Sequence, residues 1–138
     1  KVTIAKQATD LHSNAFSQQV LHRFLIDNSL DAHLEKIKEV YGRQRAAMEA
    51  ALARHCPPGV SYTRPEGGMF LWLTLPASVS AMALFDEAIK EKVAFVPGAP
   101  FYVRPEIKNT LRLSFSCVDE ATIEEGVKRL TRALARML

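Results

Sequence analysis

The chain has 138 residues, of which 48% are hydrophobic and 24% are charged, and its formal net charge is +3 at pH 7. This length and composition indicate one folded globular domain and exclude a disordered chain. The small, dispersed positive charge argues against a nucleic-acid-binding surface, and no apolar run has the length of a membrane span.

A first helix is predicted from the spacing of apolar residues near the N-terminus. Phe16, Val20 and Phe24 repeat every four positions, and Ser13 and Asn14 precede them as candidate N-caps. The pattern stops near Asp27, where polar residues take over. We therefore expect an amphipathic helix over this segment, with one apolar face.

A longer helix should follow, because apolar residues continue at three- and four-residue spacing. The Pro57-Pro58-Gly59 sequence ends this pattern. Opposite charges share the polar side of the helix, which is typical of a solvated face. The apolar positions are Leu30, Leu34, Ile37, Tyr41, Met48 and Leu52.

Strands dominate the middle of the chain. Residues 60–64 and 70–75 read as two strands around Gly67-Gly68, which predicts a β-hairpin. A short helix is expected over 81–91, followed by a strand over 93–96 that the following Pro-Gly pair breaks.

Arg112 lies in a strand-like run, residues 109–116. By alternation, Leu111, Leu113 and Phe115 take one face of this strand and Arg112 takes the other. A guanidinium does not deprotonate in proteins, and its planar fork pairs with two carboxylate oxygens at once. A carboxylate ligand is therefore its natural partner. The alternative is an arginine on the solvent face of a half-exposed strand.

A closing helix with Asp119 as its N-cap completes an α+β fold, in which helices pack on a small and largely antiparallel sheet. Such a fold leaves both an enzyme part and a ligand-binding domain open. The two cysteines lie far apart and the four histidines lack ligand spacing, so we expect no disulfide framework, no metal site and a reducing cytoplasm. The expected core residues are Phe16, Phe24, Ile37, Leu71, Leu73, Leu113, Phe115, Val127 and Leu130.

Three segments occur in a characteristic order: GGMFLW at 67–72, FVPGAPFY at 95–102 and LRLSFS at 111–116. Together they resemble the C-terminal portion of fold-type I pyridoxal-phosphate aminotransferases of class I/II. The likeness is greatest to the 2-aminoadipate, kynurenine and aromatic amino-acid group. Residues 5–12 and 123–130 are also similar to that group, so the resemblance covers nearly the whole chain.

The resemblance implies that residues 1–138 are an aminotransferase C-terminal domain, with 1–29 as an interdomain helical segment and 30–138 as the small domain. The family's Schiff-base lysine lies in a Ser-x-x-Lys context shortly before Pro-Gly-x-Arg-x-Gly, and neither motif occurs here. We therefore expect no catalytic residue, no cofactor-binding residue and no bound pyridoxal phosphate in this chain. The large cofactor-binding domain would belong to a parent enzyme, expected to be a homodimer that acts on amino acids and 2-oxo acids.

In the resemblance, Arg112 falls on the arginine that binds the substrate α-carboxylate. Phe70 matches a pocket-lining aromatic residue, and Leu11 matches an apolar residue near the substrate side chain. Phe70 and Leu11 can equally be packing residues, since both types are common in cores. Two rival functions remain open: the aminotransferase-like effector domain of a winged-helix transcription regulator, and a free-standing ferredoxin-like amino-acid sensor.

Overall fold

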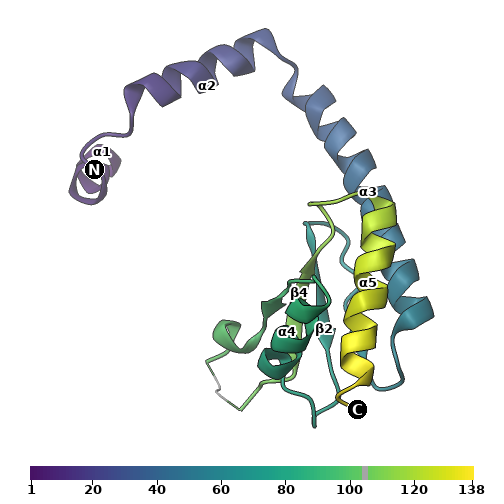
Figure 1. The fold of residues 1–138 in the computed structure, drawn as a ribbon. Coiled ribbons are helices and arrows are strands. Elements are labelled where there is room, and N and C mark those ends of the chain that lie inside the picture. The colour runs from purple at the N-terminus through teal and green to yellow at the C-terminus, as the bar shows by residue number, and fades with distance from the viewer. Residues whose placement is uncertain (104–105) are drawn as a thin grey trace. The chain divides into compact units, whose positions relative to one another are not determined.

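The computed structural model describes residues 1–103 and 106–138 of the chain. It contains two compact units, Lys1–Lys38 and Glu39–Leu138. The N-terminal unit holds helices α1 (Val2–Thr9) and α2 (Ala15–Asp27) and the start of α3 (Leu30–His55) (Figure 1). The division between the units thus falls within α3 by residue number.

The two helices predicted in this region form where the sequence places them. The side chain of Asn14 accepts a hydrogen bond from the backbone N–H of Ser17 (2.9 Å), so Asn14, one of the two predicted candidates, is the N-cap of α2 and Ser13 is not. The Ser29 hydroxyl accepts from the N–H of Ala32 (3.2 Å) and so satisfies a free donor in the first turn of α3. Helix α1 is a further element that the apolar spacing did not predict.

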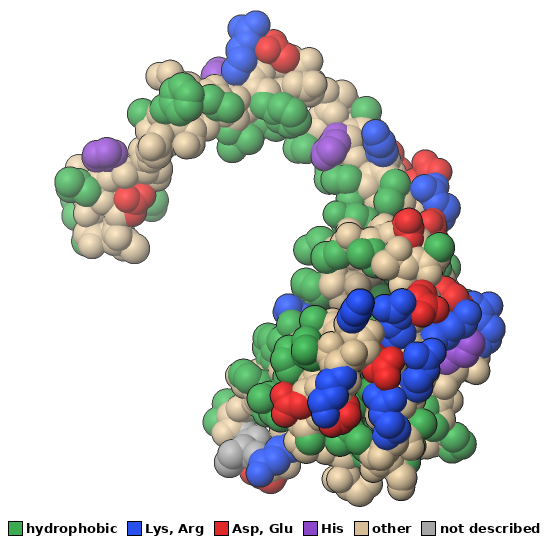
Figure 2. Space-filling view, viewed as in Figure 1, with side chains coloured by type: hydrophobic (Ala, Val, Ile, Leu, Met, Phe, Trp, Pro, Cys, Tyr) green, Lys and Arg blue, Asp and Glu red, His purple; other side chains and the backbone are tan. Residues whose placement is uncertain are grey.

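The prediction that α2 contributes to the core is wrong for the structure of this chain. Phe16 is 75% exposed and Phe24 is 47% exposed. Ile37, the third expected core residue of this unit, is only partly buried. Apolar side chains are visible along these helices in Figure 2. Amphipathic spacing predicts an apolar face but does not say which element covers it, and no element of the N-terminal unit covers this one.

The C-terminal unit is a four-stranded antiparallel sheet with helices on one face, which confirms the α+β prediction. The strand order is β1-β2-β4-β3, so β2 and β4 are central. Leu71 and Leu73 of β2 pair with Leu113 and Leu111 of β4, and all four side chains are buried. The strands are β1 (Ser61–Tyr62), β2 (Phe70–Thr74), β3 (Val96–Pro97) and β4 (Thr110–Ser114).

The helices that cover this sheet supply the rest of the core. They are the later turns of α3, helix α4 (Ala81–Lys90) and helix α5 (Glu120–Ala135) (Figure 1). The expected core residues Phe115, Val127 and Leu130 are at most 3% exposed, so this part of the prediction is confirmed. Asp119 caps α5 as predicted, because its side chain accepts from the N–H of Thr122 at 2.7 Å.

The strand predicted over residues 93–96 is displaced toward the C-terminus. Val93 is still bonded to the last turn of α4, because its N–H donates to the carbonyl of Ala88 (2.9 Å). The first residue that pairs in the sheet is therefore Val96. Pro97 then belongs to the strand instead of breaking it. Because β3 is an edge strand, the N–H that Pro97 lacks is not needed for pairing on its outer side.

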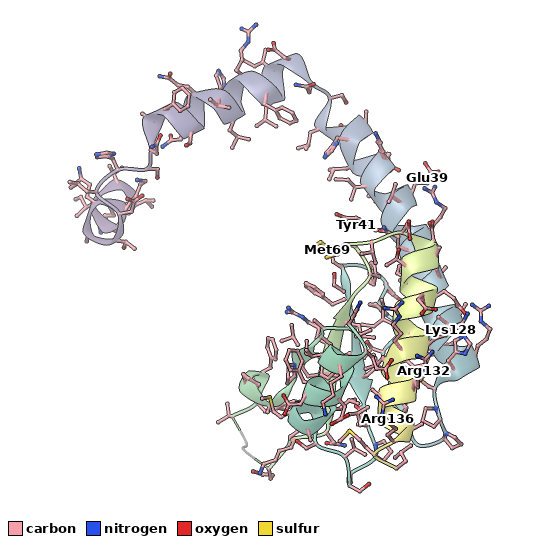
Figure 3. All side chains as sticks on the ribbon, viewed as in Figure 1. Glu39, Tyr41, Met69, Lys128, Arg132 and Arg136 are labelled. Carbon is pink, nitrogen blue, oxygen red and sulfur yellow. The ribbon has the colours of Figure 1, made fainter. Side chains whose placement is uncertain are left out.

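Charged side chains of both signs cover the outer surface of α5, where Lys128, Arg132 and Arg136 follow one another along the helix (Figures 2 and 3). Glu91, just after α4, pairs with both Arg132 and Arg136, at 3.2 and 2.8 Å. None of the helices in residues 1–103 and 106–138 is long and apolar enough to cross a membrane.

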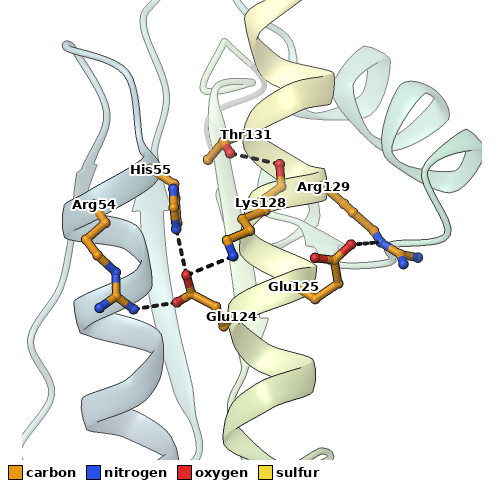
Figure 4. Close-up of polar contacts among 7 residues, drawn as sticks. All are labelled: Arg54, His55, Glu124, Glu125, Lys128, Arg129 and Thr131. Atoms are coloured by element: carbon orange, nitrogen blue, oxygen red, sulfur yellow. Dashed lines mark hydrogen bonds and ion pairs between the residues drawn. The ribbon is translucent and has the colours of Figure 1, made fainter.

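Glu124 connects α5 to the end of α3 (Figure 4). Its carboxylate contacts His55 Nε2 at 2.7 Å and Lys128 Nζ at 3.4 Å, and it also accepts from Arg54. The hydrogen bond from His55 and then that from Arg54 lower the pKa of Glu124 from its usual 4.5 to about 2. A carboxyl group with a lowered pKa stabilises the fold when it is ionised.

Replacing Glu124 with glutamine should therefore lower the urea midpoint at pH 7, where the carboxylate is charged. Because the folded pKa is below the unfolded one, this difference should persist above about pH 4.5 and shrink as the pH falls toward 2. Glu125→Gln is the matched control, since Glu125 makes a single pair with Arg129 on the same helix. A difference that is equal at pH 7 and pH 2 would show that the Glu124 charge is not the source of the stabilisation.

Candidate substrate-carboxylate site

Arg112 occupies the middle of the central strand β4, opposite Trp72 of β2 on one side and Val96 of β3 on the other. Its neighbours Leu111 and Leu113 are 0% and 6% exposed and point into the core. Arg112 therefore lies on the sheet face opposite the helices, as alternation predicts. Its side chain is half-buried, which is compatible with a ligand-binding arginine and with an arginine on the solvent face of a half-exposed strand.

Aromatic rings hold the guanidinium group. Its Cζ atom is 4.0 Å from the ring centroid of Phe70 and 5.4 Å from that of Phe101. Trp72 packs edge-on against both Phe101 and Tyr102, with ring centroids 5.5 and 6.0 Å apart. A cation over an aromatic face is attracted to the ring quadrupole while its edge stays free for hydrogen bonds.

Arg112 differs from most other arginines of the chain in having no carboxylate partner. None of the ion pairs in the described part of the chain includes it. A half-buried guanidinium without a carboxylate partner keeps N–H donors free for water or for an external anion. The arginines that do pair with a carboxylate are Arg23, Arg43, Arg45, Arg54, Arg129, Arg132 and Arg136.

A small pocket of about 190 Å³ opens beside Arg112. Apart from the guanidinium, its polar lining comes from Ser114. The remaining walls are apolar and come from β2, β3 and the segment before β3, through Phe70, Ala94, Phe95 and Val96. The site thus combines a preorganised cation with an apolar surface, which suits a ligand that has both a carboxylate and a nonpolar part.

The structure brings two of the three predicted site residues together. Phe70 is 38% exposed and its ring lies against Arg112. Leu11 is 79% exposed between α1 and α2, in the other unit, and its role near a substrate stays a prediction. Phe101, which lies in the FVPGAPFY segment but is not among the predicted site residues, also contacts Arg112. The only signal for it is its place just after Pro97-Gly98.

The residues present do not make a site for pyridoxal phosphate. A Schiff-base lysine must reach the cofactor inside the active site. All eight lysines of this chain are exposed, and none lines the pocket beside Arg112. The pocket beside Arg112 therefore contains guanidinium donors that suit an anion, and its lining includes no lysine that could bond to the cofactor.

With this geometry in place, the comparisons with known proteins identify the family. The family model for aminotransferase class I and II matches residues 2–130, so the chain belongs to that family. A 2-aminoadipate transaminase of Thermus thermophilus is 46% identical over 100% of this chain and 34% of its own length. An aromatic-amino-acid aminotransferase of Thermococcus litoralis is 43% identical over 97% of this chain and 32% of its own length.

Solved structures agree with this assignment. The crystal structure of Pyrococcus horikoshii kynurenine aminotransferase has a TM-score of 0.89 and 45% identity, covering 98% of this chain and 33% of that one. The sequence resemblance to this group is thus confirmed. The chain spans about a third of the length of these relatives. A more distant relative, an HTH-type transcriptional regulator of Bacillus subtilis, is 26% identical over 96% of this chain and 27% of its own length.

Proposed function

We propose that this chain is the C-terminal part of an amino-acid aminotransferase and that Arg112 binds the α-carboxylate of the substrate. The observation that carries the proposal is the half-buried guanidinium of Arg112, held by Phe70 and Phe101 and paired with no carboxylate in the described residues. Membership of the aminotransferase family supplies the reaction class, transfer of an amino group between an amino acid and a 2-oxo acid.

The proposed role follows from what an aminotransferase must do to its substrate. Both the amino acid and the 2-oxo acid have a carboxylate next to the reacting carbon. A bidentate contact to this carboxylate fixes the orientation of that carbon while the substrate side chain stays free. Arg112 would thus serve both half-reactions. The cofactor, pyridoxal phosphate, supplies the electron-withdrawing chemistry, and residues outside this chain would hold it.

The rest of the parent enzyme would contribute what is missing here. We propose that residues 1–29 connect the small domain to a large cofactor-binding domain, and that the exposed apolar side chains of α2 pack against it. A homodimer in the cytoplasm is expected for the parent. Leu11 would lie near the substrate side chain in the complete enzyme.

A regulator in place of an enzyme is the second candidate, because HTH-type regulators are among the relatives. The enzymes are nevertheless much more similar, at 43% and 46% identity against 26% for the regulator. The sequence that precedes Lys1 in the complete polypeptide decides between the two. A cofactor domain with its lysine motif would support the enzyme, and a winged-helix domain would support the regulator.

The complete polypeptide should transaminate, whereas the isolated chain should not. Incubation with pyridoxal phosphate and reduction with borohydride should give the complete polypeptide one pyridoxyl group on a single lysine. The isolated chain should give only scattered, substoichiometric labelling of its exposed lysines, measured by peptide mass spectrometry. A stoichiometric adduct at one lysine of the isolated chain, together with transamination, would contradict the assignment of the catalytic parts to the rest of the enzyme.

A further inference from the structure

Gly98 has an ordinary backbone conformation, with φ at −80° and ψ at −20°. Any residue adopts these angles without strain, so the conformation does not require glycine here. The space does. A Cβ atom at this position would overlap Thr110 Oγ1, and it would lie 2.8 Å from Trp72 Cζ2 and 2.9 Å from the backbone oxygen of Thr110. Among the six glycines of the chain, all within the described residues, Gly98 alone has contacts this short.

This close approach places the turn that follows β3. The N–H of Gly98 donates to the carbonyl of Thr110 at 2.7 Å, and the carbonyl of Gly98 accepts from the N–H of Phe101 at 2.9 Å. The second bond forms the short 3-10 turn η1 (Ala99–Phe101). Phe101 thereby reaches Arg112, which is two residues from Thr110 on the same face of β4. Thr110 of β4 thus contacts Gly98, Gly98 bonds to Phe101, and Phe101 contacts Arg112 in the same strand as Thr110.

The close packing of Gly98 against β4 leaves a buried hydroxyl without a hydrogen-bond partner among the described residues. Thr110 is 4% exposed, although alternation predicts an outward-facing side chain, and its hydroxyl has no hydrogen-bond partner in the described residues. A buried hydroxyl without a partner is unfavourable. Close packing of η1 on β4 thus covers the Thr110 hydroxyl, and the same packing brings the Phe101 ring against Trp72.

We propose that Gly98 is a positioning residue for Arg112. Its missing side chain lets η1 pack tightly on β4, and this packing sets Phe101 against the guanidinium so that the fork keeps one orientation. The geometric part of this inference is independent of the enzyme assignment. Its kinetic consequence rests on the proposed function, because an arginine in a fixed orientation matters most when it must align a carboxylate.

The geometric part can be tested on the 138-residue chain by NMR of the Arg112 side chain. Aromatic ring currents shift protons over a ring face, so the Arg112 Nε–H signal should report the position of Phe101. Phe101→Leu removes the ring and defines the change that its loss causes. Gly98→Ala should shift the signal in the same direction, while Gly126→Ala, where a Cβ meets nothing within 4 Å, should leave it unchanged. No shift in Gly98→Ala or in Phe101→Leu would overturn the proposal.

The kinetic part uses the complete enzyme. Gly98→Ala should raise the KM for amino and 2-oxo acids and lower kcat/KM by up to about 100-fold, the cost of a misplacement of about 1 Å. Activity toward an amine without a carboxylate should change little. If Gly98→Ala does not fold, Phe101→Leu decides the question, because Phe101 is 55% exposed and its replacement leaves the core intact. Unchanged KM values in the folded variant would overturn the proposal.

The two sets of measurements separate this inference from the proposed function. If Arg112→Lys shows no loss specific to carboxylate substrates, the proposed function fails, and the NMR comparison still tests the role of Gly98. If Arg112→Lys shows that loss while Gly98→Ala and Phe101→Leu show none, the proposed function holds and the positioning role of Gly98 is wrong.

Discussion

Replacing Arg112 with lysine in the complete enzyme should raise the KM for amino acids and 2-oxo acids alike. Lysine keeps the positive charge but loses the planar fork that pairs with both carboxylate oxygens. Loss of one hydrogen bond to a charged group costs about 1.5 to 3 kcal/mol. This corresponds to about a 10- to 150-fold weaker interaction, since 1.4 kcal/mol is tenfold. Steady-state kinetics with both substrates measures the effect.

Two controls show whether the loss belongs to the carboxylate. An amine that lacks the carboxylate should react almost equally well with the variant and the original enzyme, because it never used the contact. Arg129→Lys, in α5 and paired with Glu125, should leave both KM values unchanged. Equal losses for the amine and the amino acid would mean that Arg112 serves folding and not recognition, and the proposed function would lose its main support.

Phe115→Ala should be the most destabilising of the single replacements considered for this chain. Phe115 is 1% exposed and lies in the core between the sheet and the helices. Removing a buried phenylalanine side chain costs about 3 to 5 kcal/mol, because it combines lost transfer energy with a cavity. This is a large part of the stability of a domain of this size. Urea denaturation followed by circular dichroism measures it.

Phe16→Ala is the matched control, with the same change of side chain at a position that is 75% exposed. In the isolated chain it should alter stability by less than about 0.5 kcal/mol. In the complete enzyme the same replacement should be clearly destabilising if α2 packs on the large domain as proposed. A neutral result there would show that the apolar face of α2 stays uncovered in the parent, and an unchanged midpoint for Phe115→Ala would show that the register of β4 is wrong.

Local signals in the sequence were sufficient for most elements of this chain, with α1 and the start of β3 as the exceptions. Asn14 and Asp119 cap their helices through side-chain hydrogen bonds that involve only the next few residues. The alternation in β4 placed Leu113 in the core and Arg112 on the opposite face. These features depend on the period of the helix or strand, which the order of side chains contains directly.

Contacts between distant segments needed the tertiary structure. The exposure of Phe16 and Phe24 depends on whether another element covers α2, and the spacing of apolar residues contains no information about that element. The strand at Val96 begins late because Val93 is still bonded to Ala88 at the end of α4. Both outcomes follow from packing and hydrogen bonding that the local pattern does not express.

For the candidate site, too, one part could be predicted from the sequence and another part needed the tertiary structure. Arg112 stands out in the sequence because a permanent cation in an apolar strand requires an anion, and family resemblance adds the kind of anion. Its aromatic surroundings depend on the pairing of β2 with β4 and on the tight packing of Gly98 against Thr110. Phe101 and Arg112 are eleven positions apart, so only folding brings the ring to the guanidinium. Side-chain chemistry is a local property of the sequence, whereas the orientation of the Arg112 fork is set by the tertiary contacts around it.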